Sequence, residues 1–198
     1  MQRIVFGIDL GSRLSGNTVV AIFNHGKIHF MQVDKNVDAD LFVLNAAKHF
    51  HPEHIFLDAP LSLPGRYCGL SGFTDYHFRK CDRELKAMSP MFLGGLTARA
   101  MELRDNLEAE GIPVFETYPR EMARKQGLDQ WGYKSGKSAL LHCRSMLRKH
   151  INPQIEMDCQ DLVSWHHVDA LLALMSALAF VCNAHKVFGD ASEGCIYV

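Results

Sequence analysis

Two short apolar segments that each end in an aspartate constrain the fold of this chain more than any other feature. Residues 3–10 (RIVFGIDL) and 54–58 (HIFLD) are rich in β-branched and aromatic residues, a composition typical of buried strands. Asp9 and Asp58 lie at the ends of these segments. A carboxylate in such a strand is costly unless a cation or hydrogen-bond donors compensate it. The pattern therefore predicts a sheet that carries acidic groups at one edge.

The rest of the chain alternates between strand-like and helical segments. Asn24-His25-Gly26 predicts a short hairpin connection between the second and third strands, and Asp38 is a typical helix cap. Gly, Pro and Ser are frequent in 60–75, which predicts a long and functional loop. We expect further strands at 17–23, 27–33 and 113–118, and helices at 39–49, 76–86, 93–110, 135–151 and 166–184.

This order predicts an α/β fold. Three hairpin-linked antiparallel strands followed by two parallel strands with helical connections form a mixed five-stranded sheet flanked by helices. The order is that of the RNase H-like fold, and residues 1–198 fit a single domain of this kind.

Composition is that of an ordinary globular protein, with 47% hydrophobic and 22% charged residues. The longest apolar stretch, 170–182, is too short to span a bilayer, and the first residues lack the pattern of a signal peptide. We therefore expect a cytoplasmic protein with no membrane contact. The six cysteines form no Cys-x-x-Cys pair, and Cys143 and Cys182 lie on apolar helical faces, so reduced thiols are expected.

A third acid, Asp169, opens the apolar run 168–174. The first and fourth strands of the expected sheet are parallel neighbours, so Asp9 and Asp58 would meet at the carboxyl edge where α/β folds place their sites. Asp169 reaches the same point if the last helix crosses the sheet. Three such carboxylates suit Mg²⁺ or Mn²⁺, and two ions of this kind support phosphodiester cleavage. Each acid alone also has an ordinary structural explanation, as a turn former, a cap or an N-terminal helix acid.

Two more residues are candidates for the same site. His166 stands three positions before Asp169 on one helix face and could orient or deprotonate a water molecule, although a solvent-facing histidine fits the same position. Glu116, in the strand 113–118, is either a fourth acid or a partner that supports the others.

Several segments resemble an uncharacterised family of predicted nucleases with the RNase H fold: GIDLGS, FLDAPLSLP, RKCDRELK, VFETYPREM, HHVDALLALMSALAF and EGCIYV. The resemblance runs in order over almost the whole chain and implies that Asp9, Asp58 and Asp169 are metal ligands. It also implies that Glu116 and a cluster of Arg79, Asp82 and Arg83 lie beside them. The His-x-x-Asp pattern at 166–169 is similar to that of RuvC-type resolvases, while Cys195 stands where an aromatic residue is usual.

The overall net charge of −1 conceals a basic segment. Residues 120–149 carry a net charge of +6, and the expected helix 135–151 places Lys137, Arg144 and Arg148 on one face. Such a surface suits a phosphate-bearing partner, DNA or RNA, and a plain solvated helix face explains the charge equally well.

Two motifs are set aside. The segment 132–138 (GYKSGKS) looks like a P-loop, but it has one residue too few between its glycines and does not follow a strand. His49, His51 and His54 lack the closed shell of a structural zinc site.

The sequence thus favours a metal-dependent nuclease. A homodimer would place two such sites on two strands of a branched substrate. The alternatives are a nucleotide-binding relative of actin-like ATPases and sugar kinases, which the start GIDLGS also resembles, and a non-catalytic RNase H-fold binding module. The lack of a second glycine-rich phosphate turn opposes the first alternative, and the three retained acids oppose the second.

Overall fold

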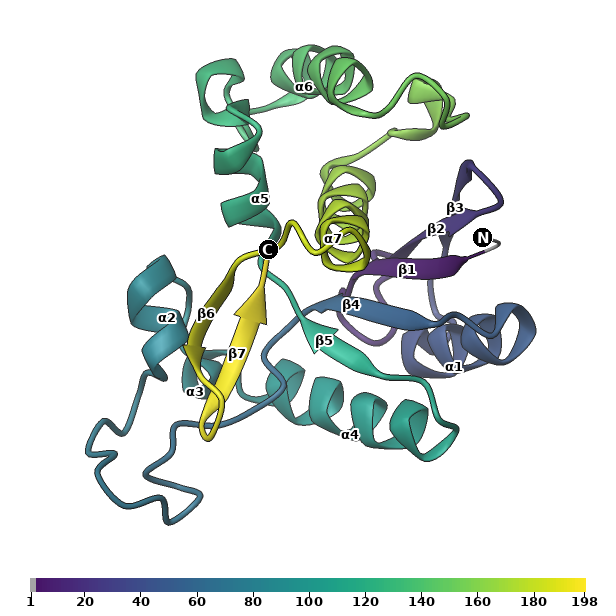
Figure 1. Ribbon diagram of the computed structural model, residues 1–198. Helices are drawn as coiled ribbons and strands as arrows, with labels where there is room; N and C mark the ends of the chain where they lie inside the picture. Colours follow the sequence, from purple (N-terminus) through teal and green to yellow (C-terminus); the bar gives the residue numbers. More distant parts are fainter. Residues whose placement is uncertain (1–2) are drawn as a thin grey trace.

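A single mixed sheet organises the chain (Figure 1). The computed structural model describes residues 3–198, with the side chain of Cys159 excepted. Its strands follow the spatial order β3-β2-β1-β4-β5-β7-β6. Their bounds are β1 Ile4–Asp9, β2 Val19–Asn24, β3 Lys27–Gln32, β4 His54–Asp58, β5 Val114–Glu116, β6 Val187–Asp190 and β7 Gly194–Tyr197.

The expected five-stranded arrangement is confirmed. β1, β2 and β3 form an antiparallel meander, and β4 and β5 continue the sheet in parallel with β1. In the parallel pair of β1 and β4, Asp9 lies directly beside Asp58. The tail forms an antiparallel hairpin of β6 and β7, which the sequence did not predict and which extends the sheet to seven strands.

Helices cover both faces of the sheet. α7 and α5 pack on one face, with α6 beyond them, while α1 and α4 cover the other face (Figure 1). The helices are α1 Ala39–Phe50, α2 Lys80–Leu85, α3 Pro90–Leu93, α4 Gly95–Ala109, α5 Pro119–Lys125, α6 Lys137–His150 and α7 Trp165–Val181, with 3₁₀ turns at Leu128–Trp131 and Cys159–Asp161. Asp38 caps α1 as expected, because its side chain accepts from the N–H groups of Asp40 and Leu41.

Two helix predictions need correction, and one observed helix had no counterpart among the predictions. The expected helix 76–86 begins only at Lys80, because Asp75 accepts hydrogen bonds from the N–H groups of His77 and Phe78 and forms a turn there. The expected helix 93–110 is divided at Gly94, whose positive φ of 46° ends α3 before α4 starts. The short helix α5 was not predicted.

Gly7 sets the distance between the sheet and α7. The alternation of β1 places Val5, Gly7 and Asp9 on the face that α7 covers. A Cβ atom on Gly7 would lie 2.0 Å from the backbone nitrogen of Leu174 and 2.5 Å from the carbonyl oxygen of Ala170. Only glycine allows this approach, so the backbone of α7 lies directly on β1.

The cysteine side chains that the structure describes lie in different surroundings. Cys68, Cys81, Cys143, Cys182 and Cys195 are free, and the side chain of Cys159 lies outside the described part of the chain. Cys143 is buried, but Cys182 is exposed beyond the end of α7 rather than on its apolar face. Among residues 3–198, no helix has both the length and the apolar character needed to cross a membrane.

We predict that Gly7→Ala destabilises the protein by about 3 kcal/mol, at the upper end of overpacking costs, because the added methyl group meets backbone atoms that cannot rotate away. Urea denaturation measures this change. Gly95→Ala is the matched control, since a Cβ there has no neighbour within 4 Å and the position begins α4. Equal stability of the two variants would contradict the close packing of α7 on β1.

Candidate metal centre

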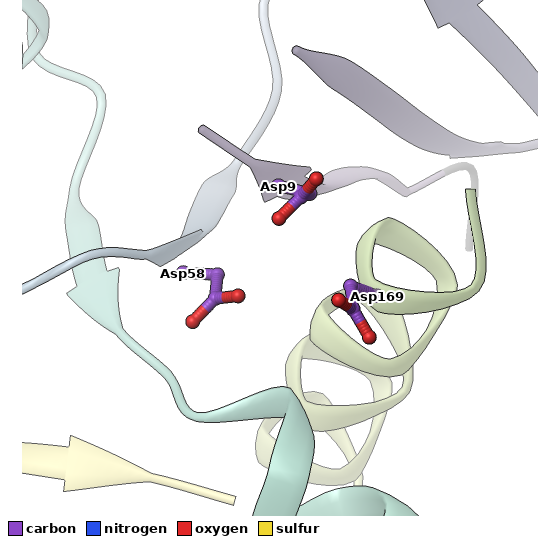
Figure 2. Close-up of side chains that lie close together, drawn as sticks. All are labelled: Asp9, Asp58 and Asp169. Carbon is purple, nitrogen blue, oxygen red and sulfur yellow. The ribbon is translucent and has the colours of Figure 1, made fainter. Parts of the chain in front are cut away.

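Three aspartates from separate elements converge at the carboxyl edge of the sheet. Asp9 ends β1, Asp58 ends β4, and Asp169 projects from α7 toward both (Figure 2). One carboxylate oxygen from each lies within 4.8 Å of the others. Within the described residues, this is the group of side chains that could hold a metal ion, and His49, His51 and His54 do not form one.

Asp169 owes its place to the packing of α7. The helix begins at Trp165, so Asp169 lies beyond the first turn. The alternative explanation of Asp169 as an ordinary N-terminal helix acid is therefore wrong. Its neighbour Ala170 contacts β1 at Gly7, two residues before Asp9. The close approach of helix and strand therefore brings the Asp169 carboxylate, whose side chain is 3% exposed, against the other two.

His166 is held by one of the proposed ligands. Its Nδ1 lies 2.7 Å from Oδ2 of Asp9. This hydrogen bond raises the pKa of His166, with burial acting in the opposite direction. The imidazole is 41% exposed at the start of α7, so it faces solvent on one side and the acidic group on the other. The expected proximity of His166 to the aspartates is present.

Asp169 has two partners that the sequence did not indicate. The Nζ atom of Lys134 lies 2.6 Å from its Oδ2, and the hydroxyl of Tyr133 donates to its Oδ1. Burial acts to lower the pKa of Lys134, but the Asp169 carboxylate outweighs it, and the net pKa is raised. Both residues come from the glycine-flanked segment that resembles a P-loop. A 3₁₀ turn rather than a strand precedes that segment. Nothing in the spacing of its residues predicts a contact with Asp169.

Asp58 has only the charge of Lys134 acting in its favour among the described residues, without a direct contact. No described residue donates a hydrogen bond to its carboxylate. Burial raises the pKa of Asp58 well above its usual value, and the charges of Asp9 and Asp169 raise it further. Carboxylates this close cannot all stay ionised without added positive charge. Their oxygen donors and spacing fit a hard divalent cation such as Mg²⁺ or Mn²⁺.

Glu116 and Arg79 form a separate buried ion pair beside this group. The guanidinium of Arg79 lies 2.6 Å from each carboxylate oxygen of Glu116 and 2.7 Å from Oδ1 of Asp82. The N–H of Leu61 also donates to Glu116. The Glu116 carboxylate is thus committed to Arg79, which fits the expectation of a supporting partner better than that of a fourth metal acid.

The expected cluster around Arg79 is only partly present. Asp82 accepts from both the backbone and the side chain of Arg79. Arg83 instead pairs with Asp75 and is exposed, so the structure does not bring it to the buried network. The pKa of Asp75 is lowered to about 2, mainly by the hydrogen bond from the His77 N–H.

A cavity of about 220 Å³ connects these features. Asp9 and Asp58 line it together with Arg79, Asp82 and Glu116. The aspartates are therefore reachable from outside while the ion pair forms part of the cavity wall.

The three basic residues expected to bind nucleic acid share the helix α6. Within residues 3–198, neither Lys137, Arg144 nor Arg148 has an acidic partner. Only two residues separate Lys137 from Lys134, which reaches Asp169. The basic residues of α6 thus follow closely in the chain after the lysine that contacts Asp169.

No protein-family model matches the sequence, and no curated protein sequence matches it. Among solved structures, the chain is similar to RuvC of T. thermophilus in complex with a Holliday junction substrate. The TM-score is 0.45 and the sequence identity 16%, over 92% of this chain and 97% of that chain. This likeness assigns no activity and no residue role to the present chain.

We predict that Asp58→Asn stabilises the metal-free protein, and more so in mildly alkaline than in acidic buffer. The pKa of Asp58 is higher in the folded state than in the unfolded state. The free energy of unfolding therefore falls as pH rises and the buried carboxyl group loses its proton. The expected gain in alkaline buffer is about 1–3 kcal/mol. Urea denaturation with a chelator present measures it at both pH values.

The exposed Asp34→Asn serves as the control and should have no effect at either pH. A gain for Asp58→Asn that shrinks as pH rises would contradict the proposed charge repulsion among the three aspartates.

Proposed function

We propose that this protein is a divalent-metal-dependent nuclease that hydrolyses phosphodiester bonds in DNA or RNA. The observation that carries the proposal is the convergence of Asp9, Asp58 and Asp169 within 4.8 Å, with Asp9 and Asp58 lining a cavity. Such a group opposes folding unless a cation is bound, and it has the oxygen donors that Mg²⁺ and Mn²⁺ prefer. When bound, these ions activate water and stabilise the leaving oxygen in phosphodiester cleavage.

The side chains around the aspartates have distinct proposed roles. Asp9, Asp58 and Asp169 hold the cation, and Tyr133 and Lys134 orient Asp169 through their contacts with its two oxygens. His166 accepts or positions the proton of the attacking water, with its ring oriented by the Nδ1 contact to Asp9. Arg79 keeps Glu116 and Asp82 paired, so these acids support the cavity wall.

The main test is a cleavage assay on labelled DNA and RNA with Mg²⁺ or Mn²⁺. We predict that Asp9→Asn abolishes cleavage while the fold stays intact or becomes more stable, because one repelling charge is removed. Asp34→Asn should cleave at the wild-type rate. An ATPase assay on the same preparations tests the actin-like alternative, and metal-dependent ATP hydrolysis without cleavage would replace the nuclease proposal. Wild-type cleavage by Asp9→Asn would exclude the metal site.

A second prediction separates His166 from Asp169, which lie on one face of α7. His166→Ala should lower the cleavage rate at saturating metal by about 10²-fold, as expected for the loss of a general base, with metal affinity little changed. Asp169→Ala should weaken Mn²⁺ binding and recover part of its activity in excess Mn²⁺. Calorimetric titration of Mn²⁺ into each variant measures the difference. An equal loss of affinity in both would make His166 a ligand instead.

A third prediction concerns the nucleic-acid surface of α6. Reversing the charges of Lys137, Arg144 and Arg148 should weaken binding and flatten the dependence of log affinity on log salt by about 2–3 units, because fewer counterions are released. Fluorescence anisotropy at several salt concentrations measures this slope. Lys48→Glu, on the exposed side of α1 beyond the opposite face of the sheet, is the control. An unchanged slope would make α6 an ordinary solvated helix.

A further inference from the structure

The cavity beside the aspartates has two chemically different walls. Asp9 and Asp58 form one side, where the proposed metal site lies. Met88, Leu93 and Leu96 contribute apolar side chains to the same cavity. A ligand that fills it must therefore combine a group suited to a cation with an apolar, flat or compact group.

The apolar wall is built by the break between α3 and α4. Leu93 ends α3 and Leu96 lies in the first turn of α4, and Gly94 turns the chain between them. Both leucines are half-buried, while Met88, just before α3, is 60% exposed. An exposed methionine beside two leucines is an adaptable surface for an apolar partner.

An exposed aromatic residue, Phe92, directly precedes Leu93 in the chain. Phe92 is 65% exposed, and its ring centroid lies 5.8 Å from that of His77 and 5.9 Å from that of Phe78. The guanidinium of Arg83 lies over the Phe78 ring, with its carbon 5.0 Å from the centroid. Exposed rings combined with an arginine are the side chains on which unpaired bases stack.

We infer that the apolar part of the cavity is a subsite for one unpaired nucleobase, next to the phosphate that the aspartate site cleaves. The volume of about 220 Å³ is below that of a pocket for a drug-sized ligand and suits a single ring system. A base that is paired and stacked within a duplex cannot enter a recess of this kind. The substrate class is therefore single-stranded or locally unpaired nucleic acid. This inference rests on the proposed nuclease function and specifies its substrate.

The test compares one oligonucleotide sequence as a single strand, as a full duplex and as a single strand with one abasic residue placed in turn at each position. We expect the wild-type protein to cleave the single strand at least about 10-fold faster than the duplex. An abasic residue next to the cut should lower the rate by about 10-fold, and one placed elsewhere should not. Anisotropy with a chelator present should show the same dependence on that base for binding alone.

Two variants connect this preference to the cavity. Met88→Trp fills the recess and Met88→Ala removes part of its wall, and both change an exposed position that folding tolerates. Each should reduce the effect of the abasic residue, while Mn²⁺ affinity measured by calorimetry stays at the wild-type value. Leu41→Trp, at a similarly exposed apolar position on α1, should behave as wild type.

The outcomes separate this inference from the proposed function. Metal-dependent cleavage at equal rates on single strand and duplex, with no effect of an abasic residue, overturns the base subsite and leaves the nuclease in place. A preference for single strands that both Met88 variants retain in full also overturns it, since the preference would then arise elsewhere. Absence of cleavage on every substrate overturns the nuclease proposal, and the base subsite with it.

Discussion

The direct packing of the α7 backbone on β1 is the constraint on which the rest of the site depends. It exists because Gly7 has no side chain at the point where Ala170 and Leu174 touch the strand. Asp9 lies two residues after Gly7, on the same face of β1. Asp169 lies one residue before Ala170 in α7. The distance between the carboxylates of Asp9 and Asp169 is thus set by a packing contact in which no polar side chain takes part. The parallel register of β1 and β4 then adds Asp58.

Charge compensation around the three aspartates is uneven, and this unevenness has a functional meaning. Asp9 has His166, and Asp169 has Lys134 and Tyr133, but no described residue donates to Asp58. Burial raises the pKa of Asp58, and the charges of Asp9 and Asp169 act in the same direction. The described residues contact two of the acids directly, and under the proposed function a bound cation would add the positive charge that Asp58 lacks, so metal binding would also stabilise the fold.

A second buried network holds the loop 59–79, which connects β4 to α2 and contributes Ala59, Pro60 and Arg79 to the lining of the cavity. Arg79, fully buried, joins Glu116 on β5 to Asp82 on α2, and it also donates to Ser62 near the start of the loop. Glu193 accepts from the N–H groups of Gly65 and Lys80, which lie near the two ends of the same loop. These contacts hold the segment before Met88 and Leu93 against the sheet, and this places the apolar wall in the same cavity as Asp9 and Asp58.

The sequence by itself determined the first five strands, the pairing of β1 with β4 and the three aspartates, because these follow from local periodicity and from the geometry of parallel strands. It pointed to Arg79 and Asp82 only through a family resemblance. It singled out Glu116 from its place on a strand, but left open whether that residue was a ligand or a support. The tertiary structure decided that Glu116 pairs with Arg79, that Arg83 turns away to Asp75, and that Lys134 reaches Asp169. It also added the hairpin of β6 and β7. The three side-chain contacts join residues 8 to 37 positions apart, where neither spacing nor hydrophobic periodicity carries information.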